Sequence, residues 1–229
     1  MRKSTFQIAI DGPVAAGKGT VAKLVAGRLG FLYVDTGAMY RGLTLYVSKM
    51  GIDWKNEEEV VGLIERDRPS VELAVPEGET HDGRLCTVLL NGEDVSWKVR
   101  TEEISHAVSP VSQYLKIREY VNKLARKMAS EQGVVMEGRD ITGVVLPEAD
   151  LKIYMDAEAM ERARRRHKEL MSRGEDISLD EVYNKLVERD KRDMEHNLKK
   201  VPGVWLLDTT KMTIEEVVEV IIKRVEEMK

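Results

Sequence analysis

The stretch Gly12-Pro13-Val14-Ala15-Ala16-Gly17-Lys18-Gly19-Thr20 decides how the rest of this chain is interpreted. The apolar run Phe6–Ile10 comes before it, and residues 21–29 repeat apolar side chains at helical spacing after it. A strand, a glycine-rich turn and a new helix are typical of a phosphate-binding loop, where backbone N–H groups and a helix N-terminus face an anion. In such a loop Lys18 reaches the outer phosphates, and Thr20 offers its hydroxyl to a phosphate-bound Mg²⁺. The alternative is an ordinary glycine-rich turn with no ligand.

Composition indicates a soluble globular protein of one or two domains. The 229 residues are 42% hydrophobic and 33% charged, and no apolar run approaches the roughly 18 residues of a membrane span. A net charge of −4 argues against broad nucleic-acid binding. The N-terminus enters a strand at once, which leaves no room for a signal peptide, so we expect a cytoplasmic protein. Cys86 is the single cysteine, and the four histidines form no ligand spacing.

Short apolar runs alternate with helical patterns over most of the chain. This alternation predicts five strands joined by crossover helices in a parallel sheet. The strands are expected at residues 6–10, 31–34, 134–136, 151–155 and 204–207. The helical patterns cover residues 21–29, a stretch ending near 49, 57–65, 101–110, 115–131, 161–171, 179–197 and 214–228.

The alternation stops for about thirty residues in the first half of the chain. Ser70–Val75 alternates polar and apolar residues, Leu85–Leu90 follows, and Asn91-Gly92 is a hairpin signal. We expect a small antiparallel insert over about residues 66–98. The alternative is a pair of edge strands on the main sheet.

Arginines gather at predicted strand and helix ends. Two phosphate groups that must react repel each other, so a site that joins them needs several fixed cations, and arginine offers bidentate geometry. Arg139 follows a predicted strand at the sheet edge where ligands collect, with a surface ion pair as the alternative. On their own, Arg189, Arg192 and Asp193 are as well explained by a solvated, ion-paired helix face.

A basic helix carrying Arg162, Arg165 and Arg166 precedes the turn at Gly174 and has the form of a hinged lid. Taken alone, a run of charged residues such as this one indicates a helix face that is exposed to solvent. The spacing of Asp140-Ile-Thr-Gly143 also fits a GTPase switch, but no Asn-Lys-x-Asp sequence is present to bind guanine.

Several motifs taken together resemble one family along the whole chain. The Gly-Lys-Gly-Thr ending of the loop is the form found in nucleoside monophosphate kinases. The run Asp35-Thr-Gly-Ala-Met-Tyr-Arg41, Glu137-Gly-Arg-Asp140 and Arg189-Asp-Lys-Arg-Asp193 follow in order, with Val99-Arg-Thr101 after the insert. In this combination the chain resembles the bacterial-type cytidylate kinases.

The resemblance implies an ATP-dependent (d)CMP kinase that uses Mg²⁺ and has a P-loop NTPase-type, three-layer α/β fold. It implies a core of about 1–65, 99–160 and 179–229, an NMP-side insert at 66–98 and a lid at 161–178, in a monomer. Lys18, Arg139 and Arg189 are the expected catalytic residues. ATP is expected at the loop residues Gly12, Pro13, Val14, Ala15, Ala16, Gly17, Lys18, Gly19 and Thr20 and at Arg162 and Arg165, with Thr20 near the metal. CMP is expected at Thr36, Tyr40, Arg41, Arg100, Ser109, Arg118, Arg139, Asp140, Arg189 and Asp193.

The chemistry of cytosine agrees with that assignment, since its amine suits a carboxylate such as Asp140 and its acceptors suit an arginine such as Arg118. Two departures concern the acceptor side. His196 stands where the family has an arginine, and the following connection is shorter. The alternatives are a kinase for UMP or another small acceptor, and a catalytically idle nucleotide-binding module.

Overall fold

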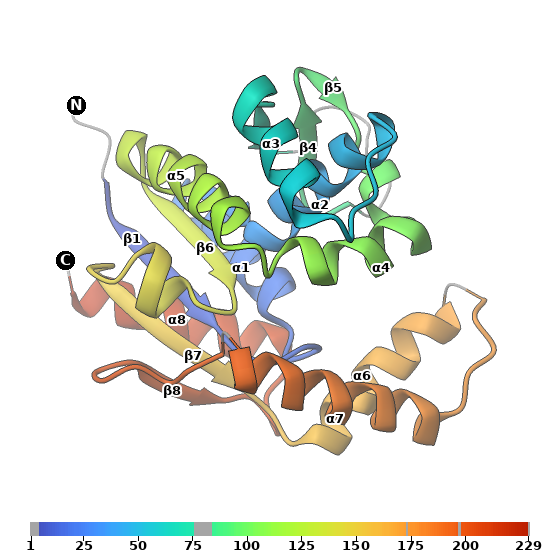
Figure 1. Ribbon diagram of the computed structural model, residues 1–229. Coiled ribbons are helices and arrows are strands. Elements are labelled where there is room, and N and C mark those ends of the chain that lie inside the picture. The colour runs from blue at the N-terminus through green and yellow to red at the C-terminus, as the bar shows by residue number, and fades with distance from the viewer. Residues whose placement is uncertain (1–4, 76–83, 173, 197, 229) are drawn as a thin grey trace. The chain divides into compact units, whose positions relative to one another are not determined.

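A computed structural model of the chain describes residues 5–75, 84–172, 174–196 and 198–228 (Figure 1). These residues form two compact units. Unit 1 consists chiefly of Phe31–Val134, and unit 2 consists of Phe6–Gly30 and Val135–Lys229.

The main sheet has five strands, as the sequence predicts. β7 pairs in parallel with β1, with Ile8 opposite Leu151, and with β8, with Ile153 opposite Trp205. The spatial order β2-β6-β1-β7-β8 shows the crossovers that the alternating pattern requires. The strands are β1 (Gln7–Asp11), β2 (Leu32–Asp35), β6 (Val134–Gly138), β7 (Leu151–Asp156) and β8 (Trp205–Asp208).

The described residues of unit 2 form four α-helices, each of which begins at a predicted start or within three residues of one. In the C-terminal helix, Thr213 and Glu216 form a reciprocal capping box, and the buried residues Val218, Ile221 and Val225 recur at helical spacing. The helices are α1 (Lys18–Leu29), α6 (Ala159–Ser172), α7 (Leu179–His196) and α8 (Ile214–Glu227). A π-helical turn, Ile141–Val145, follows β6 and is not predicted by the sequence.

Unit 1 contains the helices that follow β2 and the insert. Asp35 accepts a hydrogen bond from the Ala38 amide, and Thr101 accepts one from the Ile104 amide, so side-chain caps fix two of the helix starts. The elements are α2 (Thr36–Lys49), α3 (Glu57–Asp67), α4 (Glu102–Val111), α5 (Leu115–Glu131) and a short 3₁₀ helix (Lys98–Arg100).

The insert forms its own antiparallel sheet, so the alternative of edge strands on the main sheet is wrong. β3 (Val71–Ala74) and β4 (Thr87–Leu90) pair antiparallel, with Val71 opposite Leu90. Asn91 and Gly92 have positive φ, as a two-residue hairpin turn requires, and join β4 to a third strand, β5 (Glu93–Asp94), that the sequence did not predict. Residues 76–83 of the predicted insert lie outside the described residues.

The division into core, insert and lid stays a prediction, because the two compact units cut the chain at other points. No helix in the described part of the chain combines the length and the apolar character that crossing a membrane would need.

Candidate active site

The phosphate loop joins β1 to α1 in unit 2, and its backbone requires glycine at the first position. Gly12 has φ of +153°, and a Cβ built there would lie 2.0 Å from the main-chain oxygen of Met155. Gly17 takes φ of +87° at the N-cap of α1, and Ala15 takes φ of +60°. These left-handed positions turn the chain sharply between the strand and the helix.

Lys18, the first residue of α1, is almost fully buried, and its Nζ donates to the main-chain oxygen of Pro13 at 2.9 Å. Burial, followed by the positive charge of Arg139, lowers the pKa of Lys18 to about 7, while Glu137 and Asp11 act in the opposite direction. The phosphates of a bound nucleotide would favour the charged form. The buried lysine is therefore suited to bind an anion and is only partly charged near pH 7 without one.

Asp11, the last residue of β1, is fully buried, and the sequence interpretation assigned it no role. Its carboxylate accepts three hydrogen bonds from the turn after β6: from the Ile141 amide at 2.8 Å, and from the Thr142 amide and hydroxyl at 2.8 and 2.6 Å. Burial raises the pKa of Asp11, and the bonds from Thr142 oppose that shift. The signal in the sequence was a charged residue at the end of an apolar strand, directly before the loop.

The residues after β6 carry the predicted acceptor-binding groups of unit 2. Arg139 Nε donates to the Asp193 carboxylate of α7 at 2.8 Å, and both side chains are about a quarter exposed. Asp140 occupies the N-cap position of the Ile141–Val145 turn, but its side chain makes no cap hydrogen bond. The Asp140 side chain is therefore not what caps this turn.

The basic helix α6 is not simply solvated surface. Arg162 is buried, where its guanidinium pairs with Asp190 of α7 at 2.7 Å and donates to the main-chain oxygen of Val14 in the phosphate loop at 3.1 Å. Arg165 donates to the main-chain oxygen of Thr209 at 2.7 Å. The surface interpretation is wrong for Arg162, which links α6, α7 and the loop within unit 2.

Six of the ten predicted CMP residues belong to unit 1, and their local positions are as follows. Arg41 of α2 donates to the Ser105 hydroxyl at 2.8 Å, and Arg118 of α5 donates to the main-chain oxygen of Ser112 at 3.2 Å. Thr36 and Tyr40 are buried in the first turns of α2, whereas Arg100 and Ser109 are exposed. The other four, Arg139, Asp140, Arg189 and Asp193, belong to unit 2. Their assembly into one acceptor site stays a prediction.

The residues present fit a magnesium ion that arrives with the nucleotide. Thr20 lies in the first turn of α1 with its residue partly exposed. Among the described residues, no group of three or more His, Cys, Asp or Glu side chains is arranged to hold a metal ion. Mg²⁺ commonly uses one or two protein ligands with water and phosphate oxygens, so a single threonine hydroxyl suits it.

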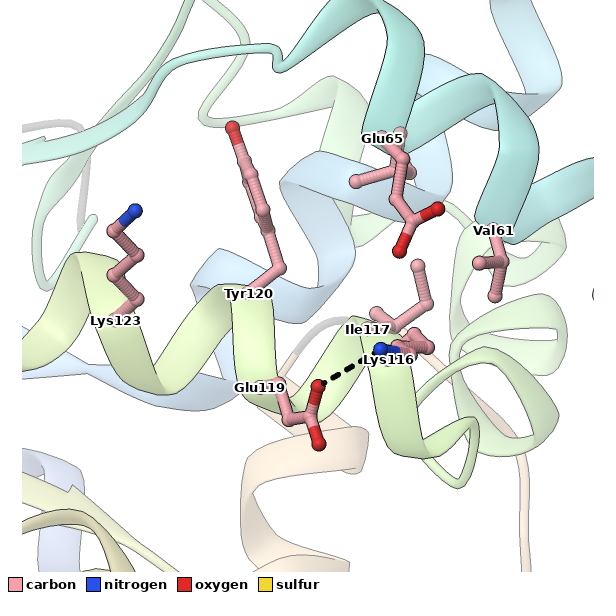
Figure 2. Close-up of a pocket in the computed structure, with 8 residues that line it drawn as sticks. Val61, Glu65, Lys116, Ile117, Glu119, Tyr120 and Lys123 are labelled. Atoms are coloured by element: carbon pink, nitrogen blue, oxygen red, sulfur yellow. Dashed lines mark ion pairs between the residues drawn. The ribbon is translucent and has the colours of Figure 1, made fainter.

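A hollow of about 190 Å³ lies between α3 and α5 of unit 1, and Figure 2 shows Glu65 and Val61 on one side of it and Tyr120 on the other. On its α5 side, Lys116 and Glu119 form an ion pair at 3.6 Å. No predicted site residue lines the hollow, and its volume is below the usual 300–1,000 Å³ of a ligand site. The hollow is therefore not the site that the sequence predicts for the nucleotides.

The side chain of His196 lies outside the described part of the structure.

A parallel sheet with a glycine loop, a buried lysine and a helix at the end of its first strand defines a P-loop α/β protein. A family model described as cytidylate kinase matches residues 8–227. The chain belongs to the cytidylate kinase family, as the sequence resemblance indicated.

Two proteins named cytidylate kinase illustrate the relationship. One, from Citrifermentans bemidjiense, is 42% identical over 230 residues, covering 99% of this chain and 95% of the relative. The other, from Bacillus thuringiensis, is 43% identical over 220 residues, covering 95% of this chain and 94% of the relative. A crystal structure of an uncharacterized protein from Eubacterium ventriosum ATCC 27560 has a TM-score of 0.53 at 12% identity, covering 96% of this chain and 98% of that one. That likeness concerns the fold alone.

Proposed function

We propose that the protein transfers the γ-phosphoryl group of ATP to CMP or dCMP, giving ADP and CDP or dCDP. The observation that carries the proposal is the family match over residues 8–227, nearly the whole chain. The buried Lys18 and the strained loop backbone of unit 2 supply the phosphate-binding chemistry that this reaction needs.

On the donor side, the loop amides and Lys18 hold the β- and γ-phosphates. An oxygen of the CMP phosphate attacks the γ-phosphorus, and the bond to the β–γ bridging oxygen breaks to release ADP. The attacking oxygen is already anionic, so no general base is required, and catalysis consists of positioning and charge neutralisation. The Thr20 hydroxyl would hold a Mg²⁺ ion carried by ATP, which would supply neutralisation of phosphate charge.

On the acceptor side, arginines hold the CMP phosphate and polar groups bind the base. Arg41, Arg139 and Arg189 supply fixed cations for the phosphate. Asp140 accepts from the cytosine amine, while Arg118 and Ser109 serve its other polar atoms. The remaining contacts to the sugar and phosphate come from Thr36, Tyr40, Arg100 and Asp193.

The lid arginines have different starting positions in this proposal. Arg165 is about one-third exposed and would have to leave Glu161 and the main-chain oxygen of Thr209 to reach a phosphate. Arg162 would have to exchange its buried Asp190 partner for the nucleotide. Closing over the substrates would exclude water, which otherwise hydrolyses ATP.

The setting of the reaction is also a proposal. We infer a monomer that acts in the cytoplasm on ATP and CMP or dCMP, without a nucleic-acid or membrane partner. The net charge of −4 supports the absence of broad nucleic-acid binding.

A coupled assay for ADP, run separately with CMP, dCMP, UMP, AMP and GMP, tests the proposal. CMP or dCMP should support turnover, with AMP and GMP nearly inert. Equal turnover with UMP would favour the UMP kinase, and nucleotide binding without ADP formation would favour the idle module. Lys18→Ala is the control, and its kcat should fall about 1,000-fold because the loop amides alone cannot neutralise the transferring group.

A further inference from the structure

The π-helical turn after β6 does not cap itself. Its later amides are satisfied internally, since Val144 and Val145 both donate to the main-chain oxygen of Asp140, at 2.9 and 3.2 Å. The first amides of a helical turn have no such partner and need an acceptor from elsewhere. An aspartate in the N-cap position usually provides it, but the Asp140 side chain makes no cap bond.

Asp11 provides the missing cap from a neighbouring strand. Its two carboxylate oxygens accept from the Ile141 amide and from both the amide and the hydroxyl of Thr142, at 2.6–2.8 Å. The carboxylate is fully buried, and charge-assisted bonds of this length in a dry site are strong and hold a fixed geometry. Asp11 also immediately precedes Gly12, so one side chain joins the end of β6 to the start of the phosphate loop.

We infer that Asp11 is a positioning residue, which caps the Ile141–Val145 turn from β1 and thereby fixes the backbone of Asp140, the residue proposed to bind the base of the acceptor nucleotide. The inference deepens the proposed function and rests on it for the identity of that base. Asp140 directly precedes the two amides that Asp11 accepts from, so the cap also holds the Asp140 backbone in place.

A purely structural role for Asp11 makes different predictions. If Asp11 only stabilised unit 2, its loss would lower the melting temperature and the fraction of active protein. The folded molecules would then keep the parent's KM for CMP and its preference for CMP over UMP. A positioning role changes both kinetic quantities, because the Asp140 backbone shifts when the turn loses its cap.

The test compares Asp11→Asn and Thr142→Val with the parent. Asp11→Asn keeps the shape but places an amide donor against the turn, and it should lower kcat/KM for CMP by about 100-fold, the effect of a misplacement near 1 Å. Thr142→Val removes the 2.6 Å bond and keeps both backbone bonds, so a loss of about 10-fold is expected. Thr142→Ser retains the hydroxyl and should restore the parent's kinetics.

The matched control is Asp150→Asn, because Asp150 is exposed and accepts from the Gln7 amide at the opposite end of β1. Its kinetics should equal the parent's. The inference is supported if the ratio of kcat/KM for CMP over UMP narrows in Asp11→Asn or, should that variant not fold, in Thr142→Val. A folded variant with the parent's ratio and KM overturns it.

Hydrogen exchange of the Ile141 and Thr142 amides separates this inference from the proposed function. Both amides should be protected in the parent and should exchange faster in Asp11→Asn or in Thr142→Val, with α8 unchanged. A parent without a preference for CMP would contradict the proposed function, and faster exchange would still support the cap. Unchanged exchange, or unprotected amides in the parent, would overturn the cap whatever substrate the enzyme uses.

Discussion

Helix α7 supplies aspartates to two ion pairs that differ in burial. The Asp190–Arg162 pair has side chains only 9% and 6% exposed, and its arginine also bonds to the phosphate loop. The Asp193–Arg139 pair, one turn later, has side chains 22% and 24% exposed. Arg162 and Arg139 are both predicted to bind substrate phosphates, yet only Arg139 can change partners without uncovering a buried charge.

The comparison separates a fixed contact from an exchangeable one. A buried charge pair is costly to break, because removal of one partner leaves the other uncompensated, whereas a solvated pair loses little. We therefore interpret Asp190–Arg162 as a structural connection and Asp193–Arg139 as a pair that holds Arg139 ready for the acceptor phosphate.

The largest expected effect is on stability. Asp190→Ala should lower the free energy of unfolding by about 3–5 kcal/mol, because the buried Arg162 keeps only the more distant carboxylate of Asp156, at 3.9 Å. Asp193→Ala, the matched variant one turn away, should lower it by about 0–1 kcal/mol. Urea unfolding of the parent and the two variants measures both values. Equal losses would remove the distinction between the two pairs.

Replacing the whole buried pair should be much less damaging. The double variant with Arg162→Met and Asp190→Leu should have a free energy of unfolding within about 1 kcal/mol of the parent's. Apolar side chains of similar volume often replace a buried ion pair without loss of stability. KM for ATP in this double variant then reports whether Arg162 also serves the donor nucleotide. If the double variant is as unstable as Asp190→Ala, the pair stabilises unit 2 beyond mutual neutralisation.

For the less buried pair, Asp193–Arg139, the effect should be on binding of CMP. Asp193→Asn should raise KM for CMP by about 10-fold, the cost of losing one charged hydrogen bond that orients Arg139, with a smaller change in kcat. The melting temperature should stay near the parent's, since the pair is partly solvated. Steady-state kinetics with varied CMP tests this, and an unchanged KM would mean that Arg139 needs no orienting partner.

The smallest expected effect is the uptake of a proton by Lys18 when nucleotide binds. Lys18 is charged below its pKa of about 7, with Asp11, Glu137, Arg139 and Arg189 as its charged neighbours, so at pH 8 it is largely neutral without nucleotide. Bound phosphates favour the charged form, and ADP binding at pH 8 should therefore take up about one proton. Calorimetry in buffers of different ionisation enthalpy counts that proton. Lys18→Met should lose the uptake, and a parent without uptake would show that the lysine is already charged.

The parts of the site built from backbone were predictable from the sequence, and the side-chain partnerships were not. Glycine at residues 12 and 17 indicated the loop because few other residues adopt its left-handed or crowded conformations. The helix and strand predictions succeeded because their apolar spacing is local. Asp11 and Asp190 were missed as partners, since Ile141 and Arg162 lie 130 and 28 positions away and only the folded chain brings them close. The turn at Ile141–Val145 was missed for the same reason, because its cap comes from another strand.

The most direct test of the account is the ratio of kcat/KM for CMP over UMP in the parent and in Asp140→Ala. A site built to bind a polar edge can reject a mismatched base by about 10⁴-fold, so the parent should strongly prefer CMP. Asp140→Ala should narrow that ratio mainly by losing activity on CMP, and the turn should keep its cap, because the Asp140 side chain makes no cap hydrogen bond. An unchanged ratio in Asp140→Ala would contradict the assignment of Asp140 to the base, and with it the interpretation of this strand end as the acceptor site.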